Sequence, residues 1–380
     1  ARGYAPRQEG QALPQLESMS HSPHLPPKQH ALNAPPLPPF VSRITLFSMS
    51  CICAIFSFLP SRLQSVLSAF MVGGLFGLMI PPLLLLHAAL VGASWYFESS
   101  YPGHAMVYGT ICIIYVVSVL LLDKAPTTPL QDKMRRQPQN FIERRSLGFW
   151  KTHFEYFPFS LVKGKKDMKL EKDKQYVFAV HPHGIHCWAL NMMAFPDSPF
   201  DAEFGLVTEG KMTGLAATVI FQIPVVRELF LSMGYVDASR SVANKVLANG
   251  RNLYVCTGGE EESMRTVQGR DVVVLKKRKG FVRLAVSHGA SLVPVFGVGI
   301  SDLYTTYSFG LGFRMWLQKS TGIALPIFHG RCLTPLPYKK PLRVLFGEPI
   351  PISPEHVPKI KGDLPDPSTV DHYHRMYIEA

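Results

Sequence analysis

The sequence predicts an α/β fold, in which a sheet covered by helices is anchored to a membrane by an apolar helical hairpin that precedes it. Two observations carry this prediction. A long and nearly uncharged stretch follows the N-terminal tail, and the rest of the chain alternates short β-rich runs with helical patterns. The 380 residues suffice for one large domain or two ordinary ones, and a hydrophobic fraction of 47% excludes a fully disordered chain.

The overall charge favours negatively charged partners. Lys and Arg together number 39 against 27 Asp and Glu, a formal excess of +12. Nucleic acid, anionic lipid and phosphorylated substrates all fit this excess, and charge alone does not choose among them. The cysteines, 6 in all, show neither zinc-ligand spacing nor a dense disulfide framework, which is typical of a reducing compartment.

Residues 1–43 form a Pro-rich tail that we expect to be disordered. Proline pairs such as Pro26-Pro27 and Pro38-Pro39 are mixed with Ser, Gln and His, so the tail offers little apolar surface to bury. The tail does not show the pattern of a secretory signal peptide, since no basic start leads into a short apolar core.

Residues 44–122 are predicted to be embedded in a membrane. Arg62 and Glu98 are their only formal charges, and a spanning helix needs roughly 20 apolar residues. A pair of buried helices in a water-soluble core is the alternative, which so few charges disfavour. The pattern predicts two apolar legs: one from Val66 to Ile80 that kinks at Pro81-Pro82 and continues to Phe97, and one from Met106 to Leu122.

The charges that flank the legs set their orientation. Cations occur before the first leg at Arg62 and after the second between Lys133 and Lys151, whereas the turn between the legs carries Glu98. Positively charged flanks stay cytosolic, so both outer ends of the hairpin are predicted on that side. Residues 44–59 are expected to be interfacial or re-entrant, because a third span would place the tail across the membrane.

Residues 123–380 have the composition of a globular domain. Short β-branched or aromatic runs predict strands at Tyr176–Val180, Leu253–Cys256, Asp271–Leu275, Ser291–Val298 and Leu342–Phe346. Helical patterns predict helices at Val225–Met233, Ser241–Ala248 and Gly280–Ser287, the last closing on His288-Gly289. This alternation predicts one α/β sheet covered by helices.

Histidines cluster directly after the first predicted strand, in the segment His181-Pro-His-Gly-Ile-His186. They would lie at the carboxyl edge of the sheet, where α/β proteins place ligands, and Gly184 leaves the backbone open to a ligand. Two alternatives stay open. The histidines can be hydrogen-bonded loop residues without a function, or His181, His183 and His186 can supply three metal nitrogens, although no second His or Cys cluster completes such a site.

A second polar segment, Thr257-Gly-Gly-Glu-Glu-Glu-Ser263, follows the second predicted strand. Thr257 with Glu260 fits a capping box, and acids in a first turn complement the helix dipole. Capping does not require two glycines. Gly258 and Gly259 therefore predict a backbone that approaches a substrate, and Glu260 can bind a substrate hydroxyl or orient a histidine.

A basic run, Lys276-Lys-Arg-Lys279, immediately precedes the helix predicted from Gly280. Cations oppose the dipole at a helix N-terminus, so an anion held by these side chains and by free backbone N–H groups would explain them. A basic patch on a membrane surface is the alternative. Nucleic acid is disfavoured, because no recognised nucleic-acid motif occurs and a membrane anchor accompanies the run.

In their order along the chain, the motifs resemble the type-2 diacylglycerol acyltransferase family, which includes the monoacylglycerol and wax-forming acyltransferases. The resemblance covers about residues 62–380. Each motif is weak alone, and they are Tyr156-Phe-Pro158, His181-Pro-His-Gly184, Pro224-Val-Val-Arg227 leading to Gly234 and Arg240, Gly258-Gly-Glu260, Arg278-Lys-Gly-Phe281, Val293–Gly297, Phe328-His-Gly-Arg331, Gly347-Glu-Pro349 and His372–Glu379. The sheet is also similar, more loosely, to that of glycerolipid acyltransferases with a His-x4-Asp motif, but that Asp is missing here.

The resemblance implies a membrane-bound O-acyltransferase that moves a fatty acyl group from acyl-CoA to diacylglycerol to form triacylglycerol. His183 would be the general base, His181 or backbone N–H groups near Gly184 the oxyanion donor, and Glu260 the substitute for the missing Asp. The expected contacts of the CoA phosphates are Arg240, the cations Lys276, Lys277, Arg278 and Lys279, and the start of the helix at Gly280. No metal or other cofactor is expected, and an acyl-Cys187 intermediate is a lesser alternative.

The resemblance also implies partners and a location. The partners are acyl-CoA, diacylglycerol and the lipid bilayer, and homo-oligomerisation is left open. The expected location is the endoplasmic reticulum membrane with the catalytic domain on its cytosolic face, and the lipid-droplet surface in addition. Monoacylglycerol or a wax alcohol is the alternative acceptor, and a non-catalytic lipid-binding or tethering protein is the alternative from another class.

Overall fold

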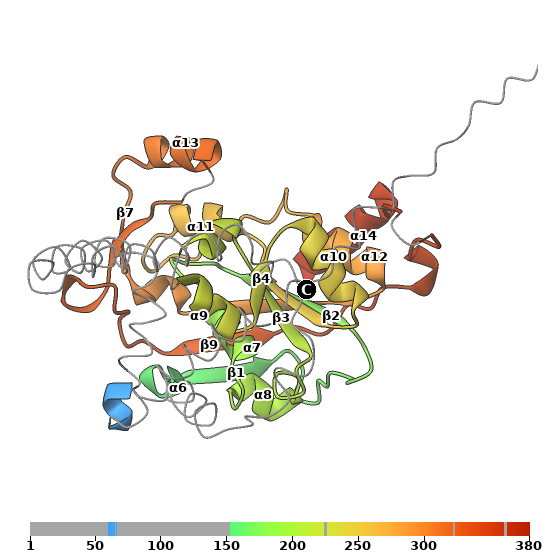
Figure 1. The fold of residues 1–380 in the computed structure, drawn as a ribbon, viewed down its shortest axis with the longest axis horizontal. Coiled ribbons are helices and arrows are strands. Elements are labelled where there is room, and N and C mark those ends of the chain that lie inside the picture. The colour runs from blue at the N-terminus through green and yellow to red at the C-terminus, as the bar shows by residue number, and fades with distance from the viewer. Residues whose placement is uncertain (1–59, 65, 67–152, 224–225, 322–323, 361–362) are drawn as a thin grey trace, which may run out of the picture. The chain divides into compact units, whose positions relative to one another are not determined.

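The computed structural model describes residues 60–64, 66, 153–223, 226–321, 324–360 and 363–380 (Figure 1). The predicted tail at 1–43 and nearly all of the predicted membrane segments at 44–122 lie outside these residues. Within the described ranges, no helix has both the length and the apolar character to cross a bilayer. The fold that can be described is therefore that of the predicted catalytic domain.

A mixed sheet of seven strands forms the centre of the described domain, in the order β1-β9-β6-β2-β5-β3-β4. Neighbouring strands are parallel except β6 and β9, which run antiparallel. This order places β2 in the middle of the sheet. The strands are β1 (Phe159–Lys163), β2 (Tyr176–His181), β3 (Met212–Ala216), β4 (Tyr235–Asp237), β5 (Asn252–Cys256), β6 (Ser291–Val298) and β9 (Leu342–Phe346).

Strand β2 is buried on both faces and separates two apolar cores. Tyr176, Phe178 and Val180 belong to one cluster, and Val177 and Ala179 belong to the other. Successive side chains of a strand point to opposite faces, so the two clusters lie on the two sides of the sheet. A strand that is covered on both sides needs an unbroken apolar run, which this segment supplies.

Helices cover each face of the sheet. The cluster that holds Val177 includes side chains of α10 (Arg240–Ala248), α12 (Gly280–His288) and α14 (Pro367–Glu379). The cluster that holds Phe178 includes side chains of α7 (Asn191–Ala194), α8 (Pro199–Phe204) and α9 (Val226–Ser232). Figure 1 shows α10, α12 and α14 grouped together beside β2. The described domain is thus an α/β/α layered fold.

The smaller elements extend this framework. Helix α11 (Gly259–Arg265) follows β5 directly, and a second sheet, β7 (Thr305–Tyr307) with β8 (Ile327–His329), flanks α13 (Leu311–Thr321) between β6 and β9. The others are α6 (His153–Tyr156) and the 3-10 helices η5 (Trp188–Leu190), η6 (Thr218–Gln222), η7 (Ile300–Leu303), η8 (Arg331–Leu333) and η9 (Pro354–His356).

Most of the predicted elements are confirmed. Four predicted strands correspond to β2, β5, β6 and β9, and the predicted helices correspond to α9, α10 and α12. Helix α12 ends at Gly289, whose left-handed φ of 65° suits a C-terminal glycine. The strand predicted at Asp271–Leu275 is wrong, because these residues join no ladder. The N–H of Val274 donates instead to the side chain of Glu262 at 2.7 Å.

We expect Tyr377→Phe to loosen the attachment of α14 to the sheet. The hydroxyl of Tyr377 donates to the carbonyl of Ala179 in β2 at 2.9 Å in a buried setting. Loss of this hydrogen bond should lower the free energy of unfolding by about 1 kcal/mol, measured by chemical denaturation of the detergent-solubilised protein. Tyr307→Phe, at a side chain that is 48% exposed, is the control. Equal losses in both variants would contradict this role of Tyr377.

Candidate active site

Strands β2 and β5 deliver two polar segments to one edge of the sheet. The strands are parallel and pair Val180 with Cys256, so the next residues, His181 at the end of β2 and Thr257 after β5, lie side by side. The histidine loop continues from β2, and α11 continues from β5. The histidines therefore lie at the carboxyl edge of the sheet, as the sequence predicts.

The carboxylate of Glu262 in α11 connects three segments at this edge. It is fully buried, it accepts the backbone N–H groups of His183 and Val274, each at 2.7 Å, and it lies 3.4 Å from Nδ1 of His181. Burial by itself raises the pKa of a carboxyl group. Here the hydrogen bonds from His181, Val274 and His183 outweigh burial and hold the pKa of Glu262 below its usual value, so the group is ionised at neutral pH.

Glycines make room for this arrangement. A Cβ at position 258 would lie 1.8 Å from Cδ of Glu262, so only a glycine at this position leaves room for the carboxylate. Gly259 has a left-handed φ of 56° and open space around its Cα. Gly184 is left-handed too, at 61°, and a Cβ there would lie 2.4 Å from a methyl group of Ile300. Each glycine thus has a steric or conformational cause within the fold.

The ring of His181 is buried between Glu262 and Thr257. Its Nδ1 faces Glu262, and its Nε2 lies 2.8 Å from the Thr257 hydroxyl. The capping box predicted for Thr257 and Glu260 is wrong, because Gly258 is the N-cap of α11 and no side chain caps the helix. Both ring nitrogens of His181 are engaged, so the predicted oxyanion-donor role does not fit its position.

The surroundings of His183 fix the tautomer of its ring and lower its pKa. Its Nδ1 lies 3.0 Å from the carbonyl oxygen of Gly184, and because a carbonyl only accepts, Nδ1 carries the proton of the neutral ring. Nε2 then keeps its lone pair. Burial lowers the pKa of His183, whereas the hydrogen bond to Gly184 and the charges of Glu262 and Glu260 raise it. The effect of burial is larger, so the pKa of His183 lies below its ordinary value of 6.5. A neutral imidazole is what abstraction of a hydroxyl proton requires.

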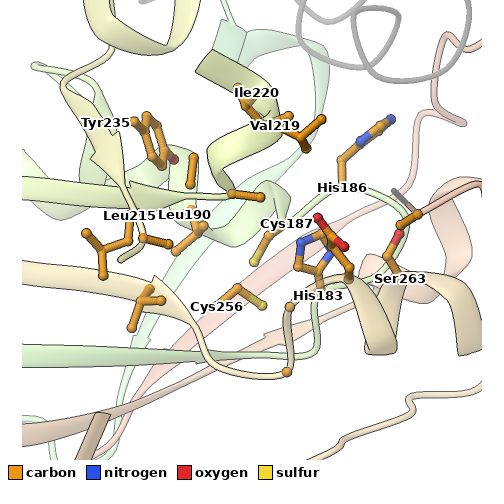
Figure 2. Close-up of a pocket in the computed structure, with 18 of the residues that line it drawn as sticks. His183, His186, Cys187, Leu190, Leu215, Val219, Ile220, Tyr235, Cys256 and Ser263 are labelled. Atoms are coloured by element: carbon orange, nitrogen blue, oxygen red, sulfur yellow. The ribbon is translucent and has the colours of Figure 1, made fainter. Parts of the chain in front are cut away.

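A cavity of about 470 Å³ adjoins His183 (Figure 2) and falls within the ~300–1,000 Å³ typical of small-molecule sites. His183, Glu260 and Arg278 supply polar groups to its wall. Figure 2 shows Leu215 and Tyr235 on one side and His183 on the other. The cavity can therefore hold an apolar chain whose polar end meets the imidazole. Its apolar wall is made mainly by η5, η6, α9 and the ends of β3 and β4, with the side chains of Leu190, Leu215, Val219, Ile220, Phe230 and Tyr235.

Two thiols lie between the apolar wall and His183. Cys187 and Cys256 both line the cavity, both are free, and their sulfur atoms face each other in Figure 2. Burial and the hydrogen bond with Cys187 raise the pKa of Cys256 well above its ordinary value of 9.0. Cys256 therefore remains a protonated thiol.

The histidines do not converge as metal ligands. His186 packs edge-on against Tyr304 and Phe328, with ring centroids 5.5 Å apart in both pairs, whereas His181 is directed at Glu262. In the part of the chain that the structure describes, no group of three or more His, Cys, Asp or Glu side chains is arranged to hold a metal ion. The geometry gives His186 an aromatic packing role.

The predicted orienting acid, Glu260, takes a different position from Glu262. Glu260 lines the cavity, and its carboxylate lies 3.4 Å from Nε2 of Gln318 in α13. Neither His181 nor His183 forms a hydrogen bond with it among those that join the described side chains. The acid that contacts the histidine loop is Glu262, while the other role predicted for Glu260, contact with a substrate hydroxyl, stays a prediction.

The basic run is divided between the cavity and the surface. Arg278 lines the cavity and pairs with Glu261 at 3.1 Å, and Lys279 pairs with Asp371 at 2.6 Å. Lys276 and Lys277 are exposed. Neither of these two forms an ion pair with another residue of the described ranges.

Two further predicted contacts of the CoA phosphates lie at helix starts. Gly280 is the first residue of α12, as predicted, and is exposed. Arg240 is the first residue of α10 and is exposed, but it does not line the cavity, which reaches only Ala238 on this segment.

We expect Glu262→Gln to destabilise the protein in a pH-dependent way. At neutral pH the loss of a buried, hydrogen-bonded carboxylate should lower the free energy of unfolding by about 3 kcal/mol. The pKa of Glu262 is lowered in the folded state, so its contribution is present above the unfolded value of ~4.3 and is lost as the pH falls through the folded value. Glu262→Gln should therefore lose less stability than the wild type on acidification.

Denaturant titrations of the detergent-solubilised protein across this pH range measure the effect. Glu260→Gln is the matched control, since Glu260 lies two residues away on the same helix and faces the cavity. A larger loss of stability for Glu260→Gln than for Glu262→Gln would contradict the assignment of the buried acid.

Comparison with known proteins extends the description of the site. The family model described as diacylglycerol acyltransferase matches residues 106–380. Acyl-CoA wax alcohol acyltransferase 2 of Mus musculus is 32% identical over 297 residues, which are 72% of this chain and 85% of that protein. Diacylglycerol O-acyltransferase 2 of Homo sapiens is 35% identical over 255 residues, 62% of this chain and 61% of that protein. Human 2-acylglycerol O-acyltransferase 3 is 33% identical over 251 residues, 62% of this chain and 70% of that protein.

One solved structure is also similar, although distantly. The 1-acyl-sn-glycerophosphate acyltransferase of Thermotoga maritima superposes with a TM-score of 0.36 at 16% identity, covering 77% of this chain and 95% of that chain. The family model, by contrast, matches well over half of the residues, and the chain therefore belongs to the diacylglycerol acyltransferase family.

Proposed function

We propose that this protein transfers a fatty acyl group from acyl-CoA to the free hydroxyl of diacylglycerol and so forms triacylglycerol. The observation that carries the proposal is the neutral imidazole of His183 beside an apolar cavity, in a chain of the diacylglycerol acyltransferase family. Relatives named diacylglycerol O-acyltransferase 2 in Homo sapiens and Dictyostelium discoideum, at 35% and 34% identity, support this acceptor.

The cavity suits the acyl chain of the donor. Its wall of aliphatic and aromatic side chains between Leu190 and Tyr235 excludes water, and the thioester carbon at the end of the chain would then lie beside His183. Arg278, which lines the same cavity, and the exposed Lys277 next to it offer cations to the CoA phosphates.

The chemistry needs one proton acceptor and one oxyanion site. As the acceptor hydroxyl attacks the thioester carbon, the new C–O bond forms and the hydroxyl proton moves to Nε2 of His183. When the tetrahedral intermediate collapses, the C–S bond breaks and the CoA thiolate takes the proton from the imidazole. The backbone at Gly258, in the cavity wall, and the backbone near Gly184 are the proposed sources of N–H donors to the oxyanion.

Glu262 acts in this mechanism as a positioning residue. It accepts the backbone N–H of His183 and so fixes the loop from which the imidazole projects. Its negative charge also raises the pKa of His183, which favours the imidazolium that forms during attack. The proposed transfer needs the hydroxyl, the thioester, the imidazole and the N–H donors to the oxyanion, and it includes no metal or other cofactor.

We further propose that residues 44–122 anchor the domain at the cytosolic face of the endoplasmic reticulum membrane and, in addition, at the lipid-droplet surface. Their near-absence of charge and the basic stretch that follows them support this location. Diacylglycerol carries no net charge and dissolves in the bilayer, so an anchored enzyme meets its acceptor there.

A second acceptor class is supported by the other relatives. The wax alcohol and 2-acylglycerol acyltransferases are 32% and 33% identical to this chain, close to the 35% of the human diacylglycerol enzyme. One assay separates these acceptors: membranes that contain the protein, labelled acyl-CoA, and diacylglycerol, monoacylglycerol or a long-chain alcohol. Triacylglycerol as the main labelled product supports the proposal, and wax ester as the main product overturns it in favour of the alternative.

We expect His183→Ala to lower kcat for acyl transfer by ~10²- to 10⁴-fold. Because the pKa of His183 is lowered, the imidazole stays neutral on mild acidification, and the acid limb of kcat/KM in the wild type should fall below pH 6.5. Labelled triacylglycerol formation across a pH series measures both quantities.

His329→Ala is the matched control for this substitution. His329 also places Nδ1 against the carbonyl of the glycine that follows it, Gly330, at 2.9 Å, but it lies in β8 and does not line the cavity. Its loss should leave kcat within about threefold of the wild type, since no transition-state contact is removed. Near-normal activity of His183→Ala would contradict the assignment of the base.

We expect the double variant Lys277→Gln/Arg278→Gln to raise the KM for acyl-CoA by roughly tenfold and to leave the KM for the acceptor unchanged. Loss of binding that is equal in the ground and transition states raises KM at constant kcat. Initial rates in vesicles of neutral lipid measure this, with Lys166→Gln/Lys169→Gln as a charge-matched control at exposed positions outside the cavity lining. An unchanged acyl-CoA KM would leave the run as a membrane contact.

A further inference from the structure

Aromatic side chains on and next to α13 are turned to solvent. Phe309 is 85% exposed, Phe313 is 66% exposed and Trp316 is 61% exposed. Phe313 and Trp316 are three residues apart on the helix and stack with ring centroids 5.7 Å apart. These three exposed side chains are here called the aromatic face, and the stacked pair within it forms an apolar surface of a kind that marks an interaction site.

The aromatic face is held outward by a buried arginine on the same helix. Arg314 is 6% exposed and donates to the carbonyl oxygens of Phe309 at 3.0 Å, Leu325 at 3.0 Å and Tyr307 at 2.9 Å. These bonds tie α13 to the segments before and after it. The aromatic rings cannot turn toward the core unless Arg314 gives up its three acceptors in a buried site, which is costly for a charged group.

The segment of chain that carries the aromatic face has formal charges of one sign. Between Asp302 and Glu348 the chain contains no Asp or Glu, whereas its cations there are Arg314, Lys319, Arg331, Lys339, Lys340 and Arg343. Lys319 lies in the last turn of α13 and is exposed. An aromatic surface on a segment that has cations and no acids of its own is complementary to the headgroup region of a phospholipid membrane.

The aromatic face also lies next to the candidate active site. Helix α13 contacts α11, and its Gln318 lines the cavity together with Leu325 and Pro326 from the segment that follows. Gln318 additionally donates to Glu260. In Figure 1, α13 is drawn next to α11. A surface on which α13 rests would therefore adjoin the cavity.

We propose that the aromatic face inserts into the headgroup region of a phospholipid membrane and brings the cavity to the lipid surface. This contact is separate from the predicted hairpin at 44–122. Only its role in substrate access rests on the proposed function, because that role assumes that the enzyme takes its substrates from the membrane. Trp and Phe on a cationic helix are the side chains that interfacial helices place ~5–10 Å into the headgroup boundary. A second copy of the chain, or the chain's own apolar residues 67–122, are the occupants that the test must distinguish.

Photo-crosslinking in the full chain identifies the occupant. Benzoylphenylalanine replaces Phe313, and the protein is reconstituted into vesicles of phosphatidylcholine and phosphatidylserine that carry a radiolabel. The control places the same group at Ile378 of α14, which is 49% exposed. We expect labelled lipid adducts at position 313 at least several-fold above those at 378. Equal lipid labelling at the two positions, a crosslinked dimer, or an intramolecular crosslink to residues 67–122 in place of the lipid adduct would overturn the proposal.

A kinetic measurement tests the consequence for the substrate. The double variant Phe313→Ser/Trp316→Ser should raise the KM for vesicle-borne diacylglycerol by roughly tenfold, with the KM for acyl-CoA and the midpoint of thermal unfolding unchanged. An unchanged acceptor KM would overturn the role of the aromatic face in substrate access. Lipid crosslinking does not depend on catalysis, so an inactive protein that still labels lipid at position 313 would contradict the proposed function and not this contact.

Discussion

The buried carboxylate of Glu262 is the interaction on which the site depends. An ionised carboxylate without partners would cost several kcal/mol in this position, so the fold must supply donors from every side. It does so from two segments outside α11: the end of β2 and the loop after it, which supply His181 and His183, and the extended segment around Val274. Removing any one of these donors would leave the buried carboxylate short of a hydrogen bond. The shape of the histidine loop is thus coupled to Glu262, which lies 79 positions from His183 along the chain.

The placement of the site follows from the sheet. β2 is buried on both faces because α7–α9 and α10, α12 and α14 each cover one, and this leaves only the carboxyl edge for polar groups. At this edge, two histidines of one motif have different surroundings. His181 has both ring nitrogens engaged, whereas His183 keeps Nε2 for the cavity. One tripeptide therefore carries both an imidazole that supports the loop and the imidazole that we propose as the base.

The sequence predicts the parts of this arrangement that depend on local pattern. The apolar run before His181 indicates a central strand, and Gly289 indicates the end of α12, because both features are set by neighbouring residues. The orienting acid could not be chosen in the same way. On a helix, each residue turns the side-chain direction by about 100°, so Glu260 and Glu262 point to different sides. Which of the two faces the histidines is known only once the start and the placement of α11 are known. Gly258 is the sequence feature that relates to the buried carboxylate, because a side chain there would clash with Glu262. This clash depends on the folded structure and cannot be inferred from the sequence alone.

The thiols in the cavity have a consequence for the donor substrate. A thioester placed beside a cysteine can transfer its acyl group to a thiolate. This side reaction would acylate the enzyme in place of the acceptor. Burial keeps Cys256 in its protonated form, in which it is a poor nucleophile. The same burial that keeps the imidazole of His183 neutral thus keeps the thiol of Cys256 from attacking a thioester bound in the proposed donor site.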